Sequence, residues 1–337
     1  MSIVAIITGV TGQDGSYLVE LLLGKGYTVF GIVRRTTYQL HNSNLTAMSM
    51  SNPFFKVFIA DLTDQSSLIK VFEAAKNFDR IEVYNLAAQS HVAVSFDCPI
   101  STVESNFLGT LYLLETIKQL NLITKTRFYQ ASTSEMFGKV QEIPQKETTP
   151  FYPRSPYGVS KLAAHWMMVN YRESYGLFGC SGFLFNHESP RRGHNFVTQK
   201  IVQCLNCLEP YLEIGNLDAK RDWGHAKDYV QAMWLMLQQD APEDYIVSSN
   251  EQHSVREFIE LVHKSPITWE GVGVDEVGRD AITGKILVKV NPAFYRPCEV
   301  DTLLGDSSKI RSIGWTPEYT FQDLVTNMCS PHLTDAE

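Results

Sequence analysis

Residues 3–15 read Ile-Val-Ala-Ile-Ile-Thr-Gly-Val-Thr-Gly-Gln-Asp-Gly, and the fold prediction begins with this stretch. An apolar, β-branched run reaches Thr8, a turn with a glycine at every third position follows, and helical sequence begins at Ser16. Glycine allows a tight turn and lets backbone amides approach a phosphate. Such a turn can be purely structural, but its place between a strand and a helix predicts a site for the pyrophosphate of a dinucleotide. The residues expected to line this site are Gly9, Thr11, Gly12, Gln13, Asp14 and Gly15.

The rest of the first half alternates short apolar runs with longer helical patterns, which is typical of βαβ units and a parallel sheet. We therefore predict an α/β fold with a doubly wound Rossmann sheet over residues 1–185, with a return near 225–250, and a smaller region over 186–337 that mainly binds substrate. The expected strands are Ile3–Thr8, Thr28–Val33, Lys56–Ala60, Glu82–Leu86, Arg127–Ser132 and Cys180–Phe185. The expected helices are Ser16–Lys25, Gln65–Asn77, Val103–Leu120, Tyr157–Tyr175, Ile201–Leu208, His225–Gln239 and Val255–His263.

Charge, hydropathy and cysteine content indicate which partners and which cell compartment suit the protein. A formal net charge of -8 disfavours general nucleic-acid binding, although it allows a local basic pocket. We find neither a signal peptide at the N-terminus nor an apolar run of the roughly 20 residues that span a bilayer. Six scattered cysteines do not form a disulfide pattern, and Cys204-Leu205-Asn206-Cys207 lacks the second pair that a zinc site needs. We expect a cytoplasmic protein without bound metal.

Two arginines at the end of the second strand indicate which dinucleotide binds. About 20 residues after the glycine turn, an NAD enzyme places a carboxylate on the ribose hydroxyls. Arg34 and Arg35 stand there instead, and guanidinium groups bind the additional phosphate of NADP. They could also be two solvated surface arginines. At other strand ends we expect Asp61, Leu62, Leu86, Ala87 and Ala88 to contact the adenine and ribose.

Tyr157 and Lys161 supply candidate proton chemistry. Their spacing of four residues places both on one face of a helix. A free tyrosine has a pKa of about 10, and a nearby cation favours its phenolate form. We therefore expect Lys161 to help Tyr157 act as a base. The pair is weak support alone, because Tyr and Lys often share a helix face, but it gains weight beside the glycine turn.

Together, Gly9–Gly15, Asp61, Ala87-Ala88, Ser132–Glu135 and Tyr157–Lys161 resemble the extended short-chain dehydrogenases/reductases over nearly the whole chain. Within that superfamily, four longer strings resemble the GDP-mannose 4,6-dehydratases. These strings are Gly12–Leu18, Ala87–Val92, Asn186–Gly193 and Arg221–Val230.

The resemblance implies a reaction and roles for its residues. Tyr157 takes the proton of the sugar 4-hydroxyl while hydride passes to NADP, and Glu135 removes the C5 proton. Water leaves from C6 with acid help from the neighbourhood of Glu135 and Thr133, and Ser134 is a further catalytic residue. Hydride then returns to C6, which gives GDP-4-keto-6-deoxymannose. Epimerases of the superfamily usually have a non-acidic residue at the place of Glu135, so this carboxylate favours a dehydratase.

The same resemblance implies binding roles. Ser90 and Arg192 would contact the cofactor, and His187 would contact its nicotinamide or ribose. Tyr157 and Lys161 would bind the cofactor in addition to their catalytic roles. As a single histidine, His187 could equally be a core residue. The segment Thr36–His41 would reach toward a neighbouring subunit in a homodimer or homotetramer, although it lacks the downstream arginine expected there. For GDP-mannose, the expected contacts are Ser90, Glu135, Asn186, Arg192, Lys200, Arg221, Arg296 and, at the guanine, Glu299.

Other functions stay open at this point. Another sugar-nucleotide dehydratase, an epimerase or a simple dehydrogenase would use the same glycine turn and Tyr157/Lys161 pair, and an NADP-sensing protein would need only the turn. A second activity, reduction of the keto product by NADPH, is also compatible with the sequence.

Overall fold

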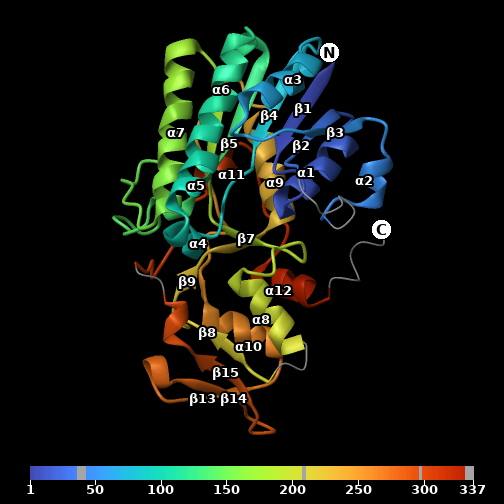
Figure 1. Ribbon diagram of the computed structural model, residues 1–337. Helices are drawn as coiled ribbons and strands as arrows, with labels where there is room; N and C mark the ends of the chain where they lie inside the picture. The colour runs from blue at the N-terminus through green and yellow to red at the C-terminus, as the bar shows by residue number, and fades with distance from the viewer. Residues whose placement is uncertain (36–42, 207–209, 296–297, 331–337) are drawn as a thin grey trace.

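The computed structural model describes residues 1–35, 43–206, 210–295 and 298–330. Its main body is a seven-stranded parallel sheet in the order β11-β6-β5-β4-β1-β2-β3, which confirms the predicted fold class (Figure 1). The strand order reverses beside β1, and ligands of open α/β sheets bind at such a switch point. The strands are β1 (Ile3–Thr8), β2 (Thr28–Val33), β3 (Phe55–Ile59), β4 (Arg80–Asn85), β5 (Thr126–Thr133), β6 (Phe178–Leu184) and β11 (Tyr245–Val247).

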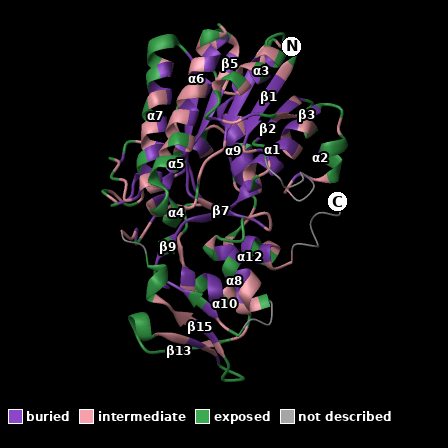
Figure 2. Cartoon of the chain, viewed as in Figure 1, coloured by how far each residue is buried: buried purple, intermediate pink, exposed green. Residues whose placement is uncertain are grey.

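Helices cover both faces of this sheet, so its central strands are buried on both sides (Figure 2). On one face α1 (Gln13–Gly24) packs against α9 (Ala226–Met236). On the other face lie α3 (Gln65–Ala75), α6 (Gly109–Gln119) and α7 (Pro156–Tyr175). Residues 4–7 of β1 are fully buried between these layers, which explains why this run lacks polar alternation.

A smaller lobe lies beyond the carboxyl ends of the strands (Figure 1). It contains α8 (Val197–Asn206), α10 (Val255–His263), α12 (Phe321–Cys329) and a four-stranded sheet in the order β13-β14-β15-β8. Ser254 and Glu257 form a capping box that starts α10, and a separate apolar core holds the lobe together. Cys204 packs against that core, whereas Cys207 lies outside the described residues. The strands are β8 (Leu212–Ile214), β13 (Ile267–Glu270), β14 (Val277–Asp280) and β15 (Ile286–Val290).

Short elements join the two parts. Strand β7 (Asn186–Glu188) pairs with β10 (Trp223–His225), and β9 (Lys220–Arg221) pairs with β12 (His253–Ser254). The other short helices are α2 (Ala47–Ser51), α4 (Val92–Asp97), α5 (Pro99–Val103) and α11 (Ser308–Ser312), with 3-10 turns at Ile123–Lys125, Ser134–Met136, Gly273–Asp275 and Pro292–Phe294.

Two features of the main body differ from the prediction. The region expected as one helix over Val103–Leu120 contains a π-helical turn, Glu104–Leu108, before α6 begins. The sheet also has a seventh strand, β11, which was not expected because three residues are too few to show a periodic pattern. No described helix is both long enough and apolar enough to cross a bilayer.

Candidate active site

A cleft of about 1270 Å³ opens at the carboxyl ends of the central strands, between the sheet and the smaller lobe. Nearly all predicted site residues line the walls of this cleft. The exceptions are Arg35, which does not line it, and Arg296 and the segment Thr36–His41, which lie outside the described residues. The predicted residues that line it are Gly9, Thr11, Gly12, Gln13, Asp14, Gly15, Arg34, Asp61, Leu62, Leu86, Ala87, Ala88, Ser90, Thr133, Ser134, Glu135, Tyr157, Lys161, Asn186, His187, Arg192, Lys200, Arg221 and Glu299.

The glycine turn forms a close backbone cradle at the start of α1. Gly9 has φ +68°, and a side chain there would place Cβ 2.9 Å from the backbone nitrogen of Ala87. Gly12 is the residue before α1 and has no side chain to cap the first amides of the helix. A helix N-terminus with amides left for a ligand attracts anions. These residues therefore fit the pyrophosphate of a dinucleotide.

Strand β7 is fastened to this turn by polar side chains. Nε2 of His187 lies 2.8 Å from Oδ2 of Asp14, and Nδ1 lies 2.8 Å from the carbonyl oxygen of Phe185. The imidazole also stacks on Tyr229, with ring centres 4.5 Å apart. Burial disfavours the charged imidazole, but the Asp14 carboxylate outweighs it and raises the pKa of His187. His187 is thus a buried, hydrogen-bonded residue that also lines the cleft.

The two arginines after β2 have different positions. Both are exposed, but only Arg34 lines the cleft. Asp61 follows β3, and its Oδ1 accepts from the backbone nitrogen of Thr63 at 2.9 Å. The backbone amides of Leu86 and Ala87, which follow β4, each donate to Oγ1 of Thr8 at 3.0 Å. These two hydrogen bonds hold the residues after β4 against the end of β1.

Tyr157 and Lys161 project from the first turns of α7. Ser155 starts this helix by accepting a hydrogen bond from the Gly158 nitrogen at 3.0 Å, and Pro156 occupies its first position. Nζ of Lys161 donates to the Ala131 carbonyl at 2.9 Å and lies 6.0 Å from the centre of the Tyr157 ring. The helix start and the end of β5 therefore fix both groups relative to each other.

Burial shifts the pKa values of both groups in the chain without cofactor. Burial raises the pKa of Tyr157 to about 12; its hydrogen bond with Thr133 opposes this shift, and the charge of Glu135 adds to it. Burial also lowers the pKa of Lys161 to about 8. The cost of placing a phenolate in a buried site thus exceeds the help from neighbouring cations.

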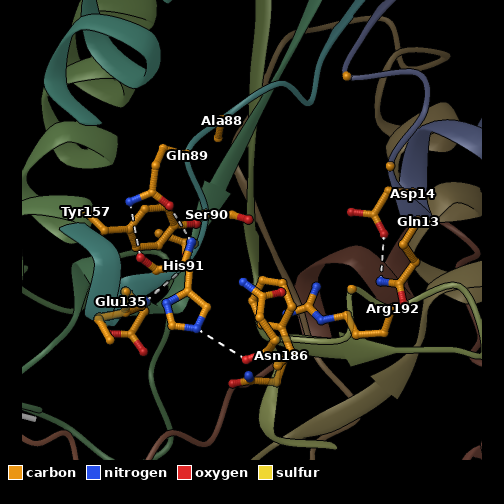
Figure 3. A pocket seen from close by; sticks show the side chains of 18 of the residues that line it. Gln13, Asp14, Ala88, Gln89, Ser90, His91, Glu135, Tyr157, Asn186 and Arg192 are labelled. Carbon is orange, nitrogen blue, oxygen red and sulfur yellow. Dashed lines mark hydrogen bonds between the residues drawn. The ribbon is translucent and has the colours of Figure 1, made fainter. Parts of the chain in front are cut away.

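Glu135 stands beside the phenol. It belongs to the 3-10 turn that follows β5, and its backbone nitrogen donates to Oγ1 of Thr133 at 3.2 Å. Figure 3 shows Glu135 and Tyr157 on the same side of the cleft, with His91 alongside and Asp14 and Arg192 across from them. A carboxylate and a phenol on one wall can handle two different protons of one substrate.

The lobe side of the cleft carries cations. Arg221 of β9 is only 7% exposed, and its guanidinium donates to the Lys220 carbonyl at 2.9 Å. Lys200 projects from α8, with Nζ 5.4 Å from the centre of the Phe294 ring. Arg221 and Lys200 can bind phosphate oxygens. Arg192 stands instead on the side of Asp14 (Figure 3) and pairs with the buried Glu188, Nε to Oε2, at 3.0 Å.

Several residues that line the cleft were missed by sequence reasoning. Arg191 donates to Oε1 of Glu20 at 2.9 Å and to Ser16 at 3.1 Å, so it fastens the loop after β7 to α1. Nε2 of His91 lies 3.3 Å from the Asn195 carbonyl oxygen and joins the two walls. The doubled arginine in Pro190-Arg191-Arg192-Gly193 was the one available signal for Arg191.

Comparisons with known proteins agree with this arrangement. The chain is 54% identical to the GDP-mannose 4,6 dehydratase of Cricetulus griseus over 340 residues, which cover 96% of this chain and 90% of that protein. It is 52% identical to the GDP-mannose 4,6-dehydratase of Vibrio cholerae over 354 residues, covering 99% and 94%.

Solved structures share the architecture. The UDP-glucose 4-epimerase of Thermus thermophilus, in complex with NAD, has a TM-score of 0.80 at 26% identity, covering 97% of this chain and 98% of that one. The dTDP-glucose 4,6-dehydratase of Bacillus anthracis, in complex with NAD, has a TM-score of 0.78 at 21% identity, covering 98% and 96%, and shows the fold alone.

The decisive match is with a sequence model of the family described as GDP-mannose 4,6 dehydratase, which extends over residues 6–328. Because that match and both relatives span nearly the whole chain, the chain belongs to the GDP-mannose 4,6-dehydratase family.

Proposed function

We propose that the protein is an NADP-dependent GDP-mannose 4,6-dehydratase, a lyase that converts GDP-D-mannose to GDP-4-keto-6-deoxy-D-mannose. The observation that carries the proposal is Glu135 beside Tyr157 in the cleft of a chain from this family. Oxidation at C4 needs only the phenol and a hydride acceptor. Elimination also needs a base for the C5 proton, and Glu135 provides it.

The main body holds the cofactor. The turn Gly9–Gly15 binds the pyrophosphate, Arg34 the 2′-phosphate, and Asp61, Leu62 and Leu86–Ala88 the adenosine half, while Ser90, His187 and Arg192 lie toward the nicotinamide half. When bound, the nicotinamide supplies a hydride acceptor that later returns the hydride. Support comes from the uncapped start of α1 and from the cationic side chain at the end of β2.

The lobe side of the cleft holds the sugar nucleotide. Arg221 and Lys200 neutralise the diphosphate, Glu299 accepts from the guanine N–H groups, and Asn186 and Ser90 face the sugar. This assigns cofactor binding mainly to residues 1–185 with a return near 225–250, and substrate binding mainly to 186–337. Arg296, which resemblance places with these cations, lies outside the described residues.

The residues of the chain act in sequence on the bound sugar. Tyr157 accepts the proton of the 4-hydroxyl as a phenolate, a form that the nearby Lys161 ammonium and the positive charge of a bound oxidised nicotinamide would favour against the effect of burial. C4 loses its hydride and becomes a ketone, while Thr133 stays hydrogen-bonded with Tyr157. The ketone acidifies C5, and Glu135 removes that proton. The C6 hydroxyl leaves as water with a proton from the Glu135–Thr133–Ser134 neighbourhood. Hydride then adds to C6 and a proton to C5, so the cofactor is unchanged after each turnover.

Product analysis tests the proposal. Purified protein is incubated with GDP-mannose and NADP, and the sugar nucleotide is examined by mass spectrometry. Loss of one water identifies a dehydratase, an unchanged mass with altered stereochemistry identifies an epimerase, and an unaltered substrate rejects both. A parallel sample with excess NADPH reveals any further gain of two hydrogens, as keto reduction would require.

We also propose that the protein is a homo-oligomer located in the cytoplasm. The family resemblance implies a homodimer or homotetramer, and exposed apolar side chains on α5 and α7, namely Ile100, Val159 and Trp166, support a protein contact there. Light scattering of the purified protein tests this. A cytoplasmic location is supported by the free cysteines among the described residues, which suit a reducing compartment.

A further inference from the structure

We propose that Asp222 is a positioning residue for the sugar nucleotide. Its carboxylate lies behind the cleft wall and fixes Arg221 together with the segment Val300–Ser307, which continues from Glu299. The inference rests on the proposed function, because that function assigns Arg221 and Glu299 to GDP-mannose.

Asp222 is fully buried between β9 and β10 and accepts hydrogen bonds from two other chain segments. Its Oδ1 accepts from the backbone nitrogen and from Oγ of Ser249, each at 2.7 Å. Its Oδ2 accepts from the nitrogens of Asn250 at 3.1 Å and Gly305 at 3.4 Å. Asp222 does not line the cleft, although its neighbours Arg221 and Trp223 do. A carboxylate matches these partners because all four are donors.

Asn250 extends this junction. It has φ +70°, a backbone conformation that few residues other than glycine adopt. Its Oδ1 accepts from the backbone nitrogen of Ser307 at 2.8 Å and from Oγ of Ser307 at 2.7 Å. At Gly305 a side chain would place Cβ 2.6 Å from Cβ of Ser248, so the Gly305 backbone lies in close contact with the Ser248 side chain. The segments 220–223, 248–250 and 305–307 therefore form one polar junction.

The same segment is tied to the substrate wall from its other end. The Lys220 nitrogen donates to the Asp301 carbonyl at 2.9 Å, and the Leu303 nitrogen donates to the Lys220 carbonyl at 3.3 Å. Val300 and Leu303 are buried in an apolar cluster with Phe137, two residues after Glu135. The backbone that carries Arg221 is therefore held by hydrogen bonds on both sides. Asp222 is the acceptor that the segments 248–250 and 305–307 share. Figure 1 shows β9 between the sheet and the lobe.

The test compares two buried aspartates. Asp222→Asn keeps the shape of the side chain, but its amide NH2 group is itself a donor and faces N–H and O–H groups whose hydrogen bonds the carboxylate accepted. Asp228→Asn is the matched control, because Asp228 is also buried and accepts from the backbone nitrogens of Glu318 at 3.0 Å and Tyr319 at 3.2 Å, yet it does not line the cleft or touch the junction. For each variant, calorimetry measures the affinities for GDP and for NADP, assays give kcat and KM for GDP-mannose, and thermal unfolding reports stability.

We expect Asp222→Asn to weaken GDP binding and raise KM for GDP-mannose about tenfold, the loss of roughly one hydrogen bond to a charged group. The kcat value and the NADP affinity should stay near those of the wild type. Asp228→Asn should lower the melting temperature and leave the GDP affinity unchanged. Unchanged GDP affinity in folded Asp222→Asn, or equal weakening in both variants, would overturn the proposal.

A second variant keeps the test decisive if Asp222→Asn does not fold. Ser249→Ala removes one of the four donors, and we expect GDP binding to weaken about threefold, with unchanged affinity counting against the proposal. The function itself is judged separately, by whether wild-type protein dehydrates GDP-mannose. A wild type that binds GDP without dehydrating GDP-mannose would reject the function and still leave the GDP affinities to decide the role of Asp222.

Discussion

Nε2 of His187 lies 2.8 Å from Oδ2 of Asp14, so one ion pair joins strand β7 to the glycine turn. Burial opposes charge on both groups, but their mutual attraction raises the pKa of His187 and lowers that of Asp14. A histidine whose pKa is raised above its unfolded value of 6.5 stabilises the fold fully below that pH. This contribution is lost as the pH rises through the folded pKa.

The first prediction concerns this pair. His187→Asn should lower the free energy of unfolding by about 2 kcal/mol near pH 6 and by less near pH 9, because the contribution of the charged imidazole is lost as the pH rises through its raised pKa. Denaturant unfolding at both pH values measures the difference. His165→Asn is the control, because that buried histidine contacts Ser181 and burial lowers its pKa. If His187→Asn lost the same free energy of unfolding at both pH values, the ion pair would not contribute to stability.

The second prediction separates two adjacent arginines. Arg34 lines the cleft and Arg35 does not, so Arg34→Ala should reduce the preference for NADP over NAD by about tenfold or more. Arg35→Ala should change it much less, and the double variant should resemble Arg34→Ala. Titration with both cofactors measures the ratio. Wild-type protein that bound NAD and NADP equally would contradict the assignment to NADP.

Part of the fold could be predicted because its signals are local. The apolar runs of β1 to β6 and the glycine turn are contiguous in sequence, and each predicted strand overlaps an observed one. The π-helical turn Glu104–Leu108 has no such signal, since its residues would also suit an α-helix. Strand β11 is formed by pairing with β6, a contact between distant residues that no local pattern reveals.

The residues of the site also differ in how far the sequence predicts their neighbours. Tyr157 and Lys161 share a helix face, so their proximity follows from spacing alone. The partners of Asp14 and Asp222 are distant in sequence, and only the folded chain shows which groups they meet. Sequence therefore identified side chains that touch the cleft more readily than those that hold its walls in place.

The third prediction concerns Lys161, whose pKa is lowered to about 8 by burial. An amine is charged below its pKa and neutral above it, so the free protein should bind NADP more weakly as the pH rises through about 8. Isothermal titration across this range measures the effect. Lys161→Met should bind weakly at every pH and lose the dependence. A wild-type affinity that stays constant across this range would show that the ammonium does not contribute to cofactor binding.

The fourth prediction assigns the base for C4 oxidation. Tyr157→Phe keeps the buried ring but removes the hydroxyl that is hydrogen-bonded with Thr133. Turnover of GDP-mannose should fall by about 10²- to 10⁴-fold, whereas the NADP affinity should change little. Steady-state assays and cofactor titration measure the two quantities. Substantial remaining turnover would move the role of base to another group.

Glu135 provides the most direct test, because its carboxylate distinguishes elimination from simple oxidation. Glu135→Gln keeps the size of the side chain but cannot accept the C5 proton. Glu104→Gln is the control, since Glu104 is another carboxylate that lines the cleft. In deuterated solvent with GDP-mannose, mass spectrometry and NMR measure dehydrated product and deuterium at C5. We predict that Glu135→Gln forms product about 10²- to 10⁴-fold more slowly, with almost no C5 exchange and with a 4-keto sugar or reduced cofactor accumulating, while the control behaves as wild type. Dehydration by Glu135→Gln at a near-normal rate would contradict the proposed role of Glu135.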